Sequence, residues 1–180
     1  MSELRKSSME ELGRISIPEY KQKEKIPVVI VLDSVRSLNN VGSAFRTADA
    51  FAIEKIILTG ITGTPPHREI QKTALGATES VAWEYVVGIQ EALQKLKREH
   101  YELIAIEQTN KSRSLHEFIT KANAKYCFVF GNEVEGVSHE ALSLVEYSLE
   151  IPQSGTKHSL NISVCVGIVL WHAYKHIKFT

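Results

Sequence analysis

The chain of 180 residues is 43% hydrophobic and 23% charged, values that suit one globular domain with a buried core. Its 21 basic and 21 acidic residues give a formal net charge of +0, which excludes a strongly basic nucleic-acid-binding protein but leaves room for a local basic patch. No apolar run approaches the roughly 20 residues that cross a membrane, and the N-terminus MSELRKSSMEEL lacks an apolar signal stretch, so we expect a cytoplasmic protein without a membrane partner.

The first 25 residues are polar and helix-prone. Within them, Ser8 and Glu11 have the spacing of a capping box, which predicts a short helix. We interpret residues 1–25 as an N-terminal extension and residues 26–180 as the main domain.

From residue 27 onward, apolar strand patterns alternate with helical patterns. Strands are expected at 27–33, 54–60, 80–87, 101–107, 126–130 and 147–152. Helices are expected at 40–52, 89–100, 114–119 and 138–145, with a turn and a short helix within 64–77. The last segment, 160–177, favours a long helix, although its β-branched residues would also fit a strand.

The predicted strands are apolar on both faces and are separated by helices. This pattern predicts an α/β domain with a mainly parallel sheet that is covered on both faces by helices. In such sheets ligands bind at the carboxyl ends of the strands. The loops that follow strands are therefore where the chemistry is expected.

Several common motifs are missing from the chain. It has neither GxGxxG nor GxxxxGK[ST], and GVSHE has Glu140 where a GxSxG elbow needs glycine. The two cysteines, Cys127 and Cys165, lie in apolar stretches without a CxxC pair, so they read as small buried side chains. His172 and His176 are spaced to share a metal, but no third ligand is evident and the polar face of a terminal helix explains them better.

The first informative loop follows strand 27–33. Asn39, Asn40 and Gly42 open the next helix, and an asparagine here can simply cap it. Arg46 lies six positions beyond Asn40, roughly 9 Å along a helix, away from the apolar face. Its position favours contact with a phosphate or ribose, whereas an isolated surface arginine is usually just solvated.

Two further loops follow strands. In FVFGNEVEGVSHEAL, Gly131 permits close approach of a ligand, Gly136 permits the turn, and Glu133 is placed to orient a ligand or exchange a proton. In LEIPQSGTKHSLNISV, Ser159 and Asn161 precede the last helix. The simpler alternatives are a plain turn with a solvated glutamate and a pair of helix caps.

In this order the three loops resemble the motifs of the SpoU (TrmH-like) family of RNA ribose methyltransferases, within the SPOUT superfamily. The chain has glutamine at 153, where the family often has methionine. The resemblance covers about residues 27 to 175. The residues that match the three family motifs are Asn40, Gly42 and Arg46, then Gly131, Asn132, Glu133 and Gly136, then Ile151, Pro152, Gly155, Ser159, Leu160, Asn161 and Ser163.

The resemblance implies a sheet whose C-terminal part forms a deep trefoil knot, a homodimer, and S-adenosylmethionine (AdoMet) as cofactor. No metal is implied, because this cofactor already carries an activated methyl group. The loop after strand 101–107 is expected to close over the cofactor. The residues that the family pattern assigns to cofactor binding are Gln108, Thr109, Gly131, Ile151, Ser159 and Leu160.

The same resemblance implies methyl transfer to a ribose 2′-hydroxyl of RNA. We expect Arg46 to bind the phosphate beside the target ribose, since a guanidinium that is always charged is a poor base. The proton would leave through that phosphate, Glu133 or water, with Asn40, Ser159 and Asn161 orienting the partners. No separate RNA-binding domain precedes residue 26, which favours tRNA over rRNA as the substrate.

Alternatives from other classes stay open. One is a SpoU-like RNA-binding protein without catalysis, against which the presence of Arg46 and Glu133 argues. Another is a SPOUT methyltransferase that acts on a base, and a third is a nucleotide-binding α/β hydrolase. The first and third motifs favour ribose, and the missing phosphate-loop and elbow motifs argue against the hydrolase.

Overall fold

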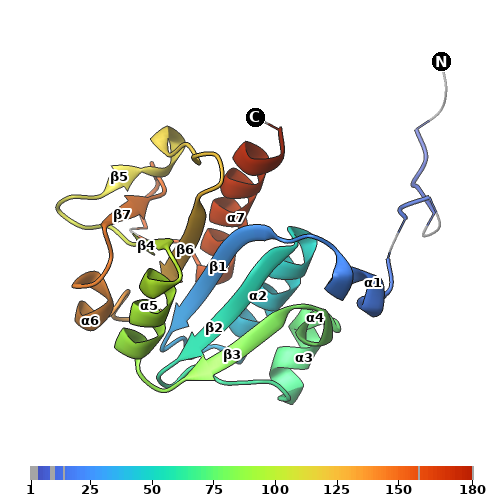
Figure 1. Cartoon of the computed structure of the whole chain (residues 1–180), viewed down its shortest axis with the longest axis horizontal. Helices are drawn as coiled ribbons and strands as arrows, with labels where there is room; N and C mark the ends of the chain where they lie inside the picture. Colours follow the sequence, from blue (N-terminus) through green and yellow to red (C-terminus); the bar gives the residue numbers. More distant parts are fainter. Residues whose placement is uncertain (1–3, 9–10, 14, 158, 180) are drawn as a thin grey trace.

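The computed structural model describes residues 4–8, 11–13, 15–157 and 159–179. Its centre is a sheet of seven strands in the order β3-β2-β1-β6-β4-β7-β5, and every pair of neighbours is parallel (Figure 1). The strands are β1 Ile26–Asp33, β2 Ile53–Thr59, β3 Ala82–Val86, β4 Tyr101–Ile106, β5 Arg113–Ser114, β6 Lys125–Phe130 and β7 Tyr147–Glu150. The predicted α/β fold with a parallel sheet is confirmed.

Helices cover both faces of the sheet (Figure 1). One face holds α2, α3, α4 and α7, with α2 in contact with the other three, and α1 packs against α4. The opposite face holds α5 and α6. Their bounds are α1 Ile17–Gln22, α2 Leu38–Ala50, α3 Arg68–Ala74, α4 Ala77–Ser80, α5 Ile89–Arg98, α6 His139–Leu142 and α7 Ile162–Phe179.

Strand β1 shows why both faces need cover. Val28, Ile30 and Leu32 belong to the hydrophobic cluster under α2 and α7, whereas Val29 and Val31 belong to the cluster under α5. Alternate side chains point to opposite faces of a strand, so an unbroken apolar run buries both. The continuous run read from the sequence therefore determines a central strand.

Two predicted helices are wrong. Residues 114–119 were expected to be helical, but only a single 3₁₀ turn forms, η1 Leu115–Glu117. Ser114 and Glu117 have the sequence spacing of a capping box, but the Ser114 hydroxyl lies 2.6 Å from His116 Nδ1 and makes no cap bond. Ser114 instead belongs to the short edge strand β5, which was not predicted.

The other correction lies in the N-terminal extension. Ser8 and Glu11 form both capping-box hydrogen bonds, but residues 11–13 form a turn rather than a helix. Helix α1 begins later, at Ile17, where Ser16 and Glu19 form a complete capping box. Tyr20 is its buried residue, which ties the extension to the domain.

The strand order places the ends of β6, β4 and β7 side by side. Three loops, which begin at residues 107, 131 and 151, therefore leave the same edge of the sheet. In the part of the chain that the structure describes, no helix is long and apolar enough to cross a bilayer.

Candidate active site

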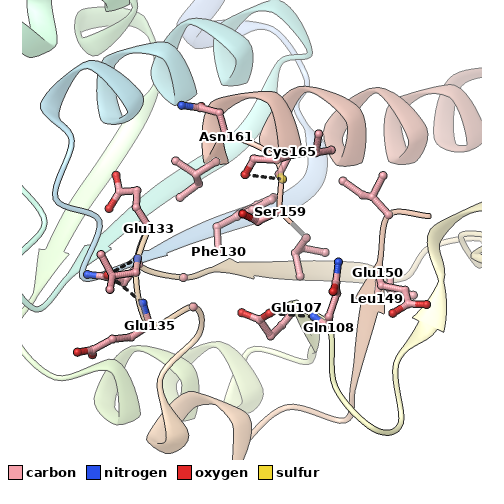
Figure 2. A pocket seen from close by; sticks show the side chains of 18 of the residues that line it. Glu107, Gln108, Phe130, Glu133, Glu135, Leu149, Glu150, Ser159, Asn161 and Cys165 are labelled. Atoms are coloured by element: carbon pink, nitrogen blue, oxygen red, sulfur yellow. Dashed lines mark hydrogen bonds between the residues drawn. The ribbon is translucent and has the colours of Figure 1, made fainter. Parts of the chain in front are cut away.

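A cavity of about 510 Å³ opens at this carboxyl edge (Figure 2). Its walls come from the ends of β4, β6 and β7, the loops that follow them, and the first turn of α7. The sheet thus positions the loops, as the rule for open α/β sheets predicts. The lining residues are Ile106, Glu107, Gln108, Phe130, Gly131, Asn132, Glu133, Val134, Glu135, Gly136, Leu149, Glu150, Ile151, Gln153, Ser159, Leu160, Asn161, Ile162 and Cys165.

The loop after β6 is a closed, hydrogen-bonded turn. The backbones of Asn132 and Gly136 bond each other in both directions, at 2.8 and 3.0 Å. Gly136 has φ of 71°, the left-handed region that favours glycine. A Cβ on Gly131 would lie 2.0 Å from the carbonyl carbon of Gly136. The loop can therefore close in this way only with glycine at position 131. The same close contact leaves the Gly131 backbone beside the cavity.

Glu133 connects this loop to the loop after β1. Its Oε2 accepts from the backbone N–H of Arg36 at 2.9 Å, and its Oε1 accepts from the N–H of Ser37 at 3.0 Å. The side-chain amide of Asn40 donates to the same Oε1 at 3.1 Å. Both carboxylate oxygens are therefore engaged in holding the loop that leads into α2.

These bonds set the ionisation of Glu133. Partial burial by itself would raise the pKa of Glu133, but the N–H groups of Arg36 and Ser37 and the Asn40 amide outweigh it and hold the pKa below its usual range. A carboxylate with a lowered pKa and occupied oxygens is a poor proton acceptor. Its contacts suit the orienting role better than the acid–base role.

The start of α2 is capped by Ser37, whose hydroxyl accepts from the N–H of Asn40. The alternative in which Asn39 or Asn40 caps the helix is therefore wrong. Asn40 lies outside the cavity lining and contacts it through Glu133. The Gly42 backbone packs against α3, where an added Cβ would lie 2.3 Å from the carbonyl oxygen of Ile70.

Arg46 lies two turns further along α2 and is exposed. It is not part of the cavity lining, and it forms no hydrogen bond or ion pair with any residue that the structure describes. Its guanidinium is therefore available to a ligand outside the cavity, as a phosphate-binding role requires.

The segment after β7 completes the cavity with Ile151, Ser159, Leu160 and Asn161. The Asn161 side chain caps α7, since its Oδ1 accepts from the N–H of Ser163 at 2.8 Å and from the Ser163 hydroxyl at 2.7 Å. The capping alternative is thus confirmed for Asn161. Ser159 is exposed and makes no side-chain hydrogen bond to any described residue.

The two residues predicted in the loop after β4 differ in their position relative to the cavity. Gln108 lines the cavity, whereas Thr109 does not. The Thr109 hydroxyl lies 2.7 Å from the hydroxyl of buried Ser148, so it holds the loop against β7.

Sequence reasoning missed two acidic residues at strand ends. Asp33 lies at the end of β1 with an exposed fraction of 3%, and its Oδ2 accepts from the N–H of Ser138 at 2.9 Å. Glu107 follows β4 and accepts from the N–H of Val137 at 3.0 Å. In the sequence each of them is the last residue of a predicted strand, and no motif marks it. The position of a carboxylate at the carboxyl end of a parallel strand was the signal that could have found them.

The cavity is acidic. Four glutamates line it, and no lysine or arginine is among the lining residues that the structure describes. None of the four forms an ion pair, as judged over the described residues. Apolar side chains also line the wall, among them Phe130, Leu149, Leu160 and Ile162. This lining suits an organic ligand with a positive charge.

Among the described residues, no group of three or more His, Cys, Asp or Glu side chains is arranged to hold a metal ion. The rings of His172 and His176 contact each other with centroids 4.6 Å apart and planes tilted by 46°, and His172 Nε2 lies 2.6 Å from the Phe118 carbonyl oxygen. These contacts fit a packing role on α7.

Known proteins with similar sequences are RNA methyltransferases by name. The chain is 28% identical over 144 residues to the 23S rRNA (guanosine-2′-O-)-methyltransferase RlmB of Neisseria meningitidis, covering 80% of this chain and 56% of that protein. It is 30% identical over 174 residues to an uncharacterized tRNA/rRNA methyltransferase of Synechocystis sp., covering 94% of this chain and 43% of that protein. The chain thus spans about half the length of these two relatives.

Solved structures share the fold. A TrmH/SpoU tRNA modifying enzyme of A. aeolicus superposes with a TM-score of 0.78 at 23% identity, covering 89% of this chain and 81% of that one. An AdoMet-bound rRNA methyltransferase of Sinorhizobium meliloti gives 0.78 at 24% identity, covering 87% and 60%.

The model of the SpoU rRNA Methylase family matches residues 27–171, most of the chain. That span contains all three of the loops that carry the resemblance and ends within α7. The chain therefore belongs to the SpoU rRNA methylase family, as its three ordered loops predicted.

Proposed function

We propose that this protein transfers the methyl group of AdoMet to a ribose 2′-hydroxyl of RNA. The observation that carries the proposal is the convergence of the three family loops at one edge of the sheet. Loops 131–137 and 151–161 line a single cavity, and Glu133 ties the first of them to the loop that leads to Arg46.

The cavity is assigned to AdoMet. A relative of the same fold is AdoMet-bound, and the lining here has the matching chemistry. Apolar side chains from β6, β7 and α7 suit the adenine, and uncompensated carboxylates suit the cationic groups. Gly131, Ile151, Ser159 and Leu160 would hold the cofactor, with Gln108 beside it. Thr109 is proposed only as support for the Gln108 loop.

Bound AdoMet would supply an activated methyl group on its sulfonium. The chain's own part is to place a 2′-oxygen in line with that group. Arg46 is proposed as the clamp on the adjacent phosphate, because it is exposed and always charged. Positioning of this kind supplies much of the rate in a group transfer.

The proton of the 2′-hydroxyl is assigned to water, because an RNA phosphodiester bound by an arginine is a weaker base than a carboxylate. Glu133 is less suited to accept it, since both of its oxygens are occupied and its pKa is lowered. Its proposed role is to hold Asn40 and the start of α2. Ser159, which has no partner among the described side chains, is available to orient the ribose.

The finer features of the family are also proposals. A trefoil knot is proposed from membership of the family alone. A homodimer is supported by α7, where Trp171 and Phe179 are 50% and 70% exposed. We expect tRNA rather than rRNA as substrate and the cytoplasm as compartment.

The experiment is transfer of labelled methyl from AdoMet to total cellular RNA that lacks the modification. It compares the wild type with Arg46→Ala and with Lys72→Ala, a matched exposed cation on α3. Label in a 2′-O-methyl nucleoside that Arg46→Ala loses and Lys72→Ala keeps would support the proposal. The size of the labelled RNA separates tRNA from rRNA.

Other outcomes would redirect the assignment. Label in a methylated base would support the base-modifying alternative. AdoMet binding without transfer to any RNA would contradict the proposed activity for the isolated chain, and absence of AdoMet binding would favour a non-catalytic RNA-binding protein.

A further inference from the structure

Glu107 has a position in the cavity that the family motifs do not explain. It follows β4, and its Oε1 accepts from the N–H of Gln108 at 2.9 Å. Its Oε2 accepts from the N–H of Val137 at 3.0 Å, and a Cβ on Gly136 would lie 2.2 Å from the same oxygen. The carboxylate is thus in direct contact with the backbone of loop 131–137.

The four glutamates of the cavity differ in what they face. Glu133 is turned to the loop after β1, and Glu150 accepts from the Ser112 hydroxyl at 2.7 Å. Figure 2 shows Glu135 and Glu150 extending toward opposite edges of the view, with Glu107 between them beside Gln108. Of the four, Glu107 therefore has the carboxylate that stays inside the cavity wall.

The charge of Glu107 is not cancelled. Its two hydrogen bonds come from neutral backbone groups, and no lysine, arginine or histidine of the described chain forms an ion pair with it. In a partly dry cavity such a charge acts on a ligand over several ångströms. A cationic ligand is favoured over a neutral one of the same shape.

AdoMet and its demethylated product differ in this respect. The sulfonium and ammonium groups of AdoMet outweigh its carboxylate by one positive charge, whereas S-adenosylhomocysteine is neutral overall. We propose that Glu107 is a specificity-determining residue that makes this cavity prefer AdoMet over S-adenosylhomocysteine. The inference rests on the proposed function, because it takes the cavity to be the cofactor site.

The preference has a consequence for turnover. Methyl transfer removes the sulfonium charge, so the attraction to Glu107 weakens at the moment when product must leave. Glu107 also holds loop 131–137, through the N–H of Val137.

The test is calorimetric binding of AdoMet and of S-adenosylhomocysteine, without RNA, to the wild type and to Glu107→Gln. We expect AdoMet affinity to fall about tenfold in the variant, since one nearby charge is removed, while product affinity changes by less than about threefold. The matched control is Glu140→Gln, which removes the same charge from an exposed side chain on α6 that does not line the cavity and should leave the ratio of the two affinities unchanged.

A parallel loss of both affinities in Glu107→Gln would overturn the inference, because a mere support for the loop would act on both ligands equally. If that variant fails to fold by thermal melting, Glu107→Asp keeps the charge and must keep the affinity ratio; loss of the ratio would contradict the inference. Absence of AdoMet binding to the wild type would contradict the proposed function instead.

Discussion

The two walls of the cavity are built differently. Three sets of side-chain hydrogen bonds hold loop 131–137 in place. Asn132 Nδ2 donates to the Ser34 carbonyl at 2.8 Å, and the Glu133 carboxylate accepts from the N–H groups of Arg36 and Ser37. The Glu107 carboxylate accepts from the N–H of Val137. Segment 151–161 forms the opposite wall. Its residues 152–157 and 159–161 are all exposed, and an added Cβ on Gly155 would meet no atom within 4 Å.

The contrast suggests how the site works. The first wall is prepared by the chain itself, so it costs little to organise when a ligand binds. The second wall obtains few of its contacts from the described part of this chain, which is consistent with a wall completed by the cofactor or by a second subunit.

The largest effect is expected at the first wall. Gly131→Ala places a methyl group 2.0 Å from the Gly136 backbone, so the loop must open. We expect a loss of AdoMet affinity of about 100-fold, on the scale of about 3 kcal/mol for overpacking. Gly155→Ala, in the other wall, should change the affinity by less than about twofold. Equal losses in calorimetry would mean that the walls do not differ.

A matched pair of helical glycines tests the support behind the first wall. Gly42→Ala would bring Cβ to 2.3 Å from the Ile70 carbonyl oxygen, and should lower the free energy of unfolding by about 1–3 kcal/mol. Gly167→Ala on α7 has no atom within 4 Å and should raise it by about 0.5–1 kcal/mol, as alanine favours helices. Urea unfolding measures both, and a stable Gly42→Ala would contradict the packing of α2 on α3.

Glu133→Gln probes the connection between the two loops. The variant replaces one acceptor oxygen by an amide that faces N–H donors, so Asn40 and the start of α2 lose their fixed position. We expect kcat for methyl transfer to fall about tenfold, with AdoMet affinity within about threefold. A fall in affinity that matches the fall in kcat would show that Glu133 serves the cofactor and not the Arg46 side.

The smallest effect is the pH dependence of stability. The pKa of Glu133 is lowered in the folded protein, so the carboxylate contributes stability above its unfolded pKa of about 4.3, and this contribution is lost as the pH falls through the folded pKa. The difference in unfolding free energy between wild type and Glu133→Gln should therefore shrink on acidification. A constant difference would mean that ionisation is not involved.

Much of the fold could be read from the sequence because its signal is local. The apolar runs of β1, β2, β4 and β6 bury both faces, and an amphipathic pattern determines α5. The 3₁₀ turn at Leu115 could not be read in this way. Its Ser114 pairs with β7 at the edge of the sheet, and this long-range contact overrides the local capping pattern.

The candidate site was predicted in part for the same reason. Glu133, Ser159 and Asn161 were found because each follows a strand or precedes a helix in a recognisable motif. Glu107 was missed because its role depends on loop 131–137, which is 24 or more residues away in the chain. That Glu133 binds the backbone at Arg36 is likewise visible only once the sheet brings β1 beside β6.

A crystal structure of the full chain with AdoMet is the sharpest test of the difference between the two walls. We predict that the cofactor lies between Gly131 and Leu160, that loop 131–137 keeps its hydrogen bonds to Glu107 and Arg36, and that segment 151–161 gains the contacts it lacks here. Cofactor bound elsewhere, or a loop 131–137 that rearranges while segment 151–161 stays unchanged, would contradict it.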